Sequence, residues 1–471
     1  MRKKALALTL ALSLGLSLSA CGKEKKNDGT TAAQNTEVVT ETPDQPQTEE
    51  PATEKKESFS DNYKPKYENL AADAKSSEAS KLTYIREDEK ETSEEFVSAK
   101  DYRSLSKASI RFFNECLTSE GSGKNVLISP YSIHEALGMT ALGANGKTRE
   151  ELEHMIGDDL TMSRISPSLA YVAARMQGDR KVSWNVANSI WINEDVPGLK
   201  TLKASYLEEA GKYYSPEIYR LPFDAAAAEE MNAWVNHETK GMIPTILENA
   251  PEGEMHLMNA VAFEGEWASP FWDNNIVEDF EFTNADGSTS NVNLLCCDGD
   301  GYFMLNGGAG FIKYYDGYEY AFVGILPQTG MTPEEYISKL DESEKSFSDA
   351  VLEAGGGKVW IEFPEFQGQY ENILNDEMEA CGVVEAFHEN ADFTGFSDDT
   401  ALKIGSVHHK TYIDVNRQGT KAAAVTDVMV DGAMEIEDEP PILALDRPFV
   451  YAIVDMATGM PIFLGVQNTM N

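Results

Sequence analysis

The chain has 471 residues, 42% of them hydrophobic, which is enough to bury one large core or two ordinary ones. Its formal net charge is −40 at pH 7. A surface this acidic repels nucleic acid, heparin-like polyanions and anionic lipid headgroups, so none of these is expected as a partner.

The first residues have the pattern of an export signal. Residues 2–4 are basic and residues 5–18 form a short apolar run. The run closes in Leu18-Ser19-Ala20-Cys21, which resembles the lipobox of bacterial lipoproteins. The resemblance implies removal of residues 1–20 and attachment of a diacylglyceryl group to Cys21, which anchors the protein to a membrane. The alternative is an ordinary secretory signal that ends in a cysteine by chance.

Residues 21–98 are rich in Glu, Thr, Lys, Gln and Pro and poor in aromatic residues, so they cannot bury enough surface to fold. We expect them to form a disordered acidic tether, with a typical span of roughly 50 Å. The four cysteines beyond Cys21 are scattered and have no histidine partners at metal-site spacing. The sequence therefore predicts buried free thiols, no metal site and no cofactor.

The folded part mixes helices and strands without a regular alternation or an internal repeat. We expect an amphipathic helix from about Asp101 and a buried helix that starts at Ser129-Pro130. Buried strands are expected over residues 182–193 and 255–265, followed by a strand and a helix within residues 363–383. The last residues predict two strands joined by a turn at Thr458-Gly459. Together these elements indicate one α+β domain, residues 99–471.

Enzyme motifs are absent: the sequence contains no GxSxG, HExxH or GxxxxGK[ST]. The GGAG stretch at Gly307 is interpreted as a turn, and the DGDG stretch, residues 298–301, as a solvated hairpin tip. His408-His409 are interpreted as structural histidines. We therefore expect no catalytic activity from this chain.

The stretch from Thr420 to Gly432 alternates in a way typical of a half-buried strand. Its even positions are small or apolar and uncharged, whereas Lys421, Asp427 and Asp431 occupy odd positions. Yet the stretch runs into an acidic segment and Pro440-Pro441, which indicate an exposed loop. A strand pattern within a loop requires an explanation.

Five segments, in the same order as in the family, make the chain from about residue 101 onward resemble the serpins. They are NVLISPYSIHEALGMTALGANGKTREEL, NAVAFEGEWASPF, ADFTGF, VHHKTYIDVNRQGTKAAAVT and DRPFVYAIVDMATGMPIFLGVQN. The resemblance implies the serpin fold, in which helices surround a large central mixed sheet and a reactive-centre loop is exposed. In inhibitory serpins, a protease cuts this loop, and the loop then inserts into the central sheet as a new strand. That movement explains the alternation, because a charge at an even position would be buried without a partner.

The family pattern assigns roles to residues of this sequence. The implied hinge consists of Gly419, Thr420, Lys421, Ala422, Ala423, Ala424, Val425 and Thr426. The polar cluster implied at the point where the sheet opens consists of Ser129, Ser132, Asn259 and His409, and Trp267 is implied near the loop's entry. Counting from Gly419 places the reactive-site bond between Ala433 and Met434, with a shift toward Met434 or Ile436 left open.

The implied function is suicide-substrate inhibition of an extracellular serine protease, elastase-like or subtilisin-like because Ala433 is small. We expect a monomer and no heparin-like cofactor, since residues 163–180 lack a basic helix face. Arg417-Gln418 stand where the family usually has acidic residues, and Lys421 replaces a common Glu, which leaves the usual lysine contact in doubt. Two alternatives remain open, a non-inhibitory serpin that acts as a surface binding protein and a cross-class inhibitor of papain-like cysteine proteases.

Overall fold

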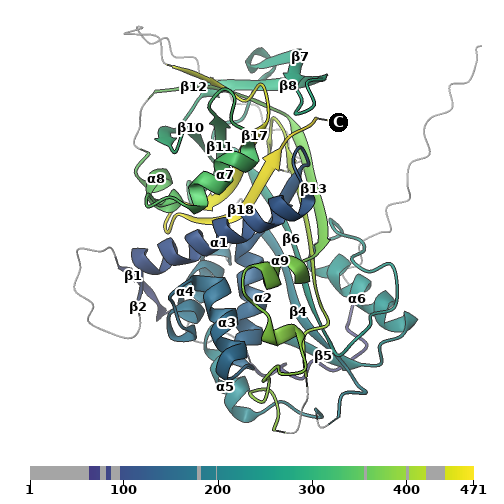
Figure 1. The fold of residues 1–471 in the computed structure, drawn as a ribbon. Helices are drawn as coiled ribbons and strands as arrows, with labels where there is room; N and C mark the ends of the chain where they lie inside the picture. Colours follow the sequence, from purple (N-terminus) through teal and green to yellow (C-terminus); the bar gives the residue numbers. More distant parts are fainter. Residues whose placement is uncertain are drawn as a thin grey trace, which may run out of the picture. The chain divides into compact units, whose positions relative to one another are not determined.

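The computed structural model describes residues 63–74, 81–85, 96–177, 182–197, 199–354, 358–398, 402–420 and 441–470 (Figure 1). They belong to one compact unit, Lys56–Asn471. The predicted signal peptide, Cys21, the hinge from Lys421 onward and the Ala433–Met434 bond lie outside the described residues. Within the described ranges, no helix is both long and apolar enough to cross a membrane.

The largest sheet, called the central sheet below, has six strands. In spatial order they are β13 (Phe366–Ile373), β14 (Ser406–Val415), β15 (Gly419–Thr420), β6 (Met255–Glu266), β4 (Val182–Asn193) and β5 (Glu217–Leu221). β14 pairs with β6 in parallel, whereas β13 with β14 and β4 with β6 are antiparallel. The predicted large mixed sheet is therefore confirmed, as are the strands expected at residues 182–193 and 255–265.

A second six-stranded sheet, antiparallel throughout, contains the hairpin predicted at the C-terminus. Its strands, in order, are β3 (Val126–Ile128), β18 (Met460–Gln467), β17 (Phe449–Asp455), β11 (Tyr320–Pro327), β10 (Gly308–Tyr314) and β9 (Gly301–Leu305). Every residue of β17 and β18 is buried, which explains their nearly unbroken apolar sequence. Gly459 closes their turn with a positive φ of 75°, and a Cβ there would lie 2.8 Å from that of Ser348.

Two smaller sheets complete the strands. One has the order β16 (Ile442–Ala444), β12 (Trp360–Pro364), β8 (Thr289–Asp298) and β7 (Ile276–Thr283), and the other pairs β1 (Thr83–Ile85) with β2 (Phe96–Ser98). The DGDG stretch connects β8 to β9, which belong to different sheets, so its interpretation as a hairpin tip is wrong. Its Asp and Gly residues do favour a turn, but they carry no information about which strands pair.

The central sheet is covered on both faces. The helices are α1 (Ala99–Glu120), α2 (Pro130–Leu142), α3 (Gly146–Gly157), α4 (Met162–Met176), α5 (Ala204–Tyr213), α6 (Ala225–Glu238), α7 (Pro333–Asp341), α8 (Phe347–Leu352) and α9 (Asn375–Ala380), with two short 3₁₀ helices, η2 (Asp273–Asn275) and η3 (Glu385–Phe387). Figure 1 shows α2 on one side of β4 and β6 and α6 on the other. Ser129 caps α2, as predicted, and Pro130 occupies its first position.

The start of the folded part differs from the prediction. The tether was expected to reach residue 98, but residues 63–74 pack against β5 and α6 within the compact unit, and β1 and β2 pair with each other. A few anchors explain the difference: Ala71 is buried, and Tyr63 and Tyr67 pack against an apolar cluster that includes Trp191 and Trp234. These anchors could not be recognised from the sequence, because the segment is polar on average. For residues 21–62, the tether remains a prediction.

Candidate functional site

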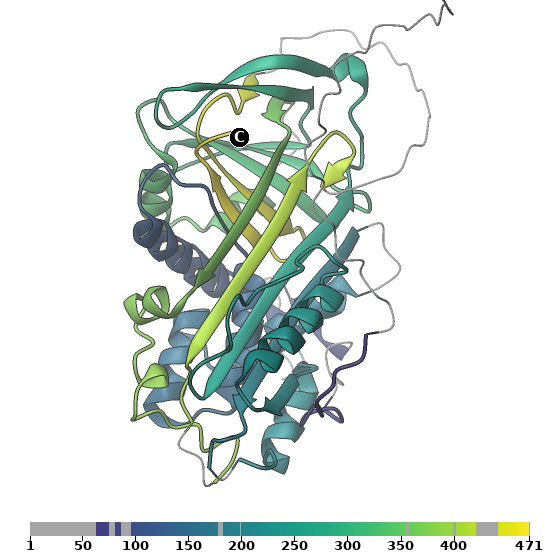
Figure 2. The same ribbon diagram turned by 90° about the vertical axis from the view of Figure 1, so that its right-hand side faces the viewer.

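The central sheet is opened at one end by the start of the predicted hinge. β6 and β14 pair directly from His256 with Ser406 to Ala262 with Tyr412. Further along, β15 lies between them, antiparallel to both (Figure 2). We call the directly paired part the β6–β14 seam. β6 and β14 therefore separate by one strand at the end of the seam, and β15 points into it.

Thr420 is the first even position of the alternating stretch, and its side chain is buried in the core. In the sheet, Thr420 pairs with Gly265 of β6 on one side and with Val415 of β14 on the other. The Thr420 hydroxyl lies 2.6 Å from the hydroxyl of Tyr315. The prediction that even positions face the core is confirmed at Thr420, the one even position that the structure describes.

Gly419 is required by close packing. A Cβ atom at this position would lie 2.0 Å from the carbonyl oxygen of Gly265, far inside van der Waals contact. Gly419 also closes a tight turn, because the N–H of Asn416 donates to its carbonyl at 2.8 Å. Only glycine allows β15 to approach β6 this closely.

Trp267 holds this turn from the side, as its predicted place near the loop's entry implies. Its indole N–H donates to the Asn416 carbonyl at 2.9 Å, and its backbone N–H donates to the Gln418 carbonyl at 3.0 Å. The indole ring stacks on Tyr315, with ring centroids 4.6 Å apart. Trp267 and Tyr315 thus form an aromatic floor that positions the turn and Thr420.

The usual family contact at this place pairs an acidic residue with a lysine. Here Arg417 pairs with a carboxylate instead. Its guanidinium donates to the two carboxylate oxygens of Glu365 at 3.1 and 3.2 Å, and its backbone N–H donates to the same group at 3.0 Å. Burial raises the pKa of Glu365, but the hydrogen bonds from Arg417 and Asn293 outweigh it and hold the pKa below its usual range. The base of the loop is therefore fixed by an ion pair whose basic member, Arg417, lies on the hinge side.

The predicted polar cluster exists, and all four of its residues are fully buried. The Ser129 N–H donates to Nε2 of His409 at 3.1 Å, and the Ser132 hydroxyl donates to Asn188 at 2.8 Å. The Asn259 amide donates to Ser132 and Asn188, and its oxygen bonds to Nδ1 of His409. Burial lowers the pKa of His409 to about 3, so the ring is neutral at pH 7. The cluster joins α2 to three adjacent strands.

Three contributors to the site escaped the sequence reasoning: Asn188, Tyr315 and Glu365. Asn188 pairs with Asn259 across β4 and β6 and could have been suspected as a polar residue within a buried strand. Tyr315 and Glu365 gave no signal, because their partners lie 105 and 52 residues away in sequence.

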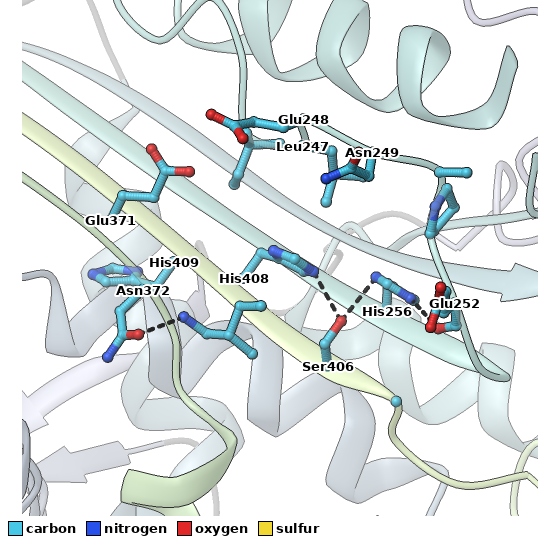
Figure 3. Close-up of a pocket in the computed structure, with 15 residues that line it drawn as sticks. Leu247, Glu248, Asn249, Glu252, His256, Glu371, Asn372, Ser406, His408 and His409 are labelled. Atoms are coloured by element: carbon cyan, nitrogen blue, oxygen red, sulfur yellow. Dashed lines mark hydrogen bonds between the residues drawn. The ribbon is translucent and has the colours of Figure 1, made fainter. Parts of the chain in front are cut away.

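His408 faces the opposite side of the sheet from His409. Its Nε2 lies 2.8 Å from the Ser406 hydroxyl, which lies 2.8 Å from Nδ1 of His256 (Figure 3). Burial lowers the pKa of His408 to about 4. These residues line a cavity of about 550 Å³ together with residues 246–252 and 371–373. His408 and His409 are thus both held by hydrogen bonds, consistent with the structural role expected for them.

The architecture is thus α+β, built around a large mixed central sheet in which β6 and β14 separate at one end to admit β15. Residues 103–469 match the family model Serpin (serine protease inhibitor), and the chain belongs to the serpin family. Human neuroserpin is 26% identical over 375 residues, which cover 76% of this chain and 88% of neuroserpin.

Solved structures resemble the fold as well. The native state of Tengpin, a thermophilic serpin, has 32% identity and a TM-score of 0.73, covering 86% of this chain and all of that one. Its latent state has 31% identity and a TM-score of 0.66, covering 81% of this chain and all of that one. The expected serpin fold is confirmed.

Proposed function

We propose that this serpin is a suicide-substrate inhibitor of extracellular serine proteases with an elastase-like or subtilisin-like specificity. The observation that carries the proposal is β15: the hinge already occupies the first two places of a new strand, with Thr420 buried. The alternating stretch continues directly from it.

The register of β15 supports the length of the loop as well. Thr420 faces Gly265 on β6, and an antiparallel strand that continues in this register brings Val430 opposite Met255, where β6 begins. The uncharged even positions continue through Gly432 to Met434 and Ile436. The alternation therefore covers the whole length that an inserted strand would occupy beside β6 and runs a few residues beyond it.

In the proposed reaction, the protease's serine attacks the Ala433 carbonyl, and the Met434 amine leaves as the acyl ester forms. The freed loop then inserts between β6 and β14, carries the acylated protease along and distorts its oxyanion hole before water can hydrolyse the ester. The serpin supplies no catalytic group. The native state stores the free energy that insertion releases.

We also propose that the diacylglyceryl group on Cys21 anchors the protein, as a monomer, to the outer face of a membrane. The lipobox-like sequence and the polar stretch after it support this placement. Mass spectrometry of protein extracted from the producing cells tests it. A chain that begins at an acylated Cys21 is the expected result, and an unmodified N-terminus contradicts the anchor.

The inhibition is tested by mixing the full chain with pancreatic elastase and with subtilisin, followed by denaturing gels and mass analysis of the released peptide. We expect a complex that resists denaturant and a peptide that starts at Met434. A peptide that starts elsewhere keeps the mechanism and moves the bond. Clean cleavage without a complex, by these and by papain-like proteases, contradicts the proposal and favours a non-inhibitory binding protein.

A further inference from the structure

The cavity of about 550 Å³ lies between the segment 246–252 and the ends of three strands of the central sheet (Figure 3). His256 comes from β6, His408 from β14 and Glu371 from β13. Its volume falls within the range of small-molecule sites, about 300–1,000 Å³. The proposed inhibition uses no molecule bound in this cavity, so the cavity has no role in it.

Part of the lining of this cavity is apolar. Leu247 and Pro251 belong to the segment 246–252, and Ile373, at the end of β13, is 50% exposed although it is a large apolar side chain. A molecule with an apolar body would remove this surface from water when it enters the cavity. The lining therefore suits a ligand that is partly apolar.

A chain of hydrogen bonds fixes the protons on the two histidines of the cavity. Nε2 of His256 lies 2.5 Å from the Glu252 carbonyl, which can only accept, so this nitrogen carries a hydrogen. Burial lowers the pKa of His256 and that of His408, so both rings are neutral at pH 7. Nδ1 of His256 must then accept, and its donor is the Ser406 hydroxyl at 2.8 Å. Because this hydroxyl has only one hydrogen, its oxygen accepts from Nε2 of His408 at 2.8 Å.

His408 is therefore left with an unprotonated Nδ1. Within the described part of the chain, no donor reaches this nitrogen, and the side chain is only 9% exposed. Since Ser406 occupies Nε2, Nδ1 is the polar atom that the ring offers to the cavity it lines. A buried acceptor without a partner costs free energy, so a ligand that brings a hydrogen-bond donor is favoured here.

The charge around the cavity is negative. Glu248 and Glu252 are exposed, and among the described residues neither carboxylate is paired with a cation. The third carboxylate, that of Glu371, is compensated by Lys410. Two uncompensated carboxylates and a bare imidazole nitrogen favour a cation that can donate hydrogen bonds. No group of three or more side chains in the described ranges could hold a metal ion, so an organic cation fits better than a metal.

We propose that this cavity binds a small organic cation with an apolar body. Its ammonium group donates to Nδ1 of His408, and the carboxylates of Glu248 and Glu252 balance its charge. The apolar body packs against Leu247 and Ile373. None of these residues belongs to the reactive-centre loop or the hinge, so the site goes beyond the proposed inhibition and does not depend on it.

Calorimetric titration of the full chain at physiological ionic strength tests the site with two probes of nearly the same shape. Tryptamine carries an ammonium on an apolar ring system, and indole-3-propionate carries a carboxylate in its place. We expect tryptamine to bind at one site with a Kd on the order of 100 µM, as its small size implies, and the anion not to bind. Bound tryptamine should slow hydrogen exchange in residues 246–256 and 405–409, measured by mass spectrometry.

Two variants separate the parts of the site. His408→Phe keeps an aromatic ring and removes Nδ1, and it should weaken tryptamine binding about tenfold, as loss of one charge-assisted hydrogen bond predicts. Glu248→Gln/Glu252→Gln changes exposed residues only, so the fold should tolerate it, and it should weaken binding about fivefold to tenfold.

The matched control is Glu208→Gln/Glu229→Gln, which removes the same number of charges from exposed residues outside the cavity. Its affinity for tryptamine should equal that of the unmodified chain. Equal weakening in the two double variants would mean that tryptamine is attracted by the acidic surface as a whole, which overturns the site. Equal binding of tryptamine and indole-3-propionate, or no binding of tryptamine at millimolar concentration, overturns it as well.

Discussion

Asn259 and His409 lie directly opposite each other on β6 and β14, joined by a hydrogen bond between the amide oxygen and Nδ1. Both are buried beneath the sheet, at the point that an inserting loop would have to separate. Continuing the two registers of β15, Thr420 with Gly265 and Thr420 with Val415, brings Thr426 opposite both residues. Insertion would break the hydrogen bond between Asn259 and His409, and the Thr426 hydroxyl would then lie between their side chains.

Thr426→Val tests this exchange of partners, because valine keeps the branched shape and removes the hydroxyl. We expect the stability gained after loop cleavage to fall by about 1–3 kcal/mol, since buried polar groups of Asn259 and His409 would lack a partner. Urea unfolding of the cleaved and intact forms measures the gain. Equal gains in the variant and the unmodified chain would show that the hydroxyl does not reach the pair.

Ala424→Arg places a charge at an even position, which the register puts opposite Val261 and Thr411 on the core side of the sheet. Insertion would bury this charge without a partner, at a cost of several kcal/mol. We expect the variant to be cleaved as a substrate without forming the denaturant-resistant complex, while its intact form keeps its fold. The complex and the cleaved chain are separated on denaturing gels.

The matched control is Val425→Arg, at the neighbouring odd position, which would lie on the other face of the sheet beside Lys410, where the carboxylate of Glu371 already pairs with a cation. Inhibition by this variant should survive. If Ala424→Arg inhibits as well as Val425→Arg does, the loop does not insert with the register of β15, and the insertion mechanism is wrong.

Much of the fold was predictable because its signals are local. The cap at Ser129, the turn at Gly459 and the periodicity of β4 are each visible within a dozen residues. What could not be predicted depends on strands that meet from distant parts of the chain: the floor made by Tyr315, the partner of Arg417 and the docking of residues 63–74. The polar cluster was predictable only through the family resemblance, because isolated serines and a histidine have no pattern of their own.

Gly419→Ala tests whether β15 must lie in the sheet. The added Cβ would collide with the Gly265 carbonyl, so we expect β15 to leave its place and Thr420 to lose its contact with Tyr315. The native state should lose about 1–3 kcal/mol of unfolding free energy, measured in urea. Gln418→Ala is the control, because the hydrogen bonds of Gln418 are made by its backbone and the side chain is exposed. A loss of equal size in both variants would contradict the packing argument.

The pair of Arg417 and Glu365 can be tested by charge reversal. Arg417→Glu should lower the unfolding free energy by about 1 kcal/mol, because the two groups are partly exposed and like charges would replace a two-pronged contact. Adding Glu365→Arg should restore most of the loss, since the reversed pair can form the same contact. A double variant that is no more stable than the single one would mean that the pair contributes no specific interaction.

Acid should weaken the native state in a way that depends on His409. Burial lowers its folded pKa to about 3, below the ordinary value of 6.5, so folding favours the neutral ring. Its contribution to stability is fully present above pH 6.5 and is lost as the pH falls toward 3, by about 1.4 kcal/mol per pH unit. Urea unfolding at pH values from 7.5 to 5 should show His409→Gln with a correspondingly shallower decline, whatever its stability at pH 7.5. His154→Gln, at a side chain that is 55% exposed, should leave the slope unchanged. Parallel slopes in all three proteins would mean that His409 is already solvated in the native state and that the seam is open without cleavage.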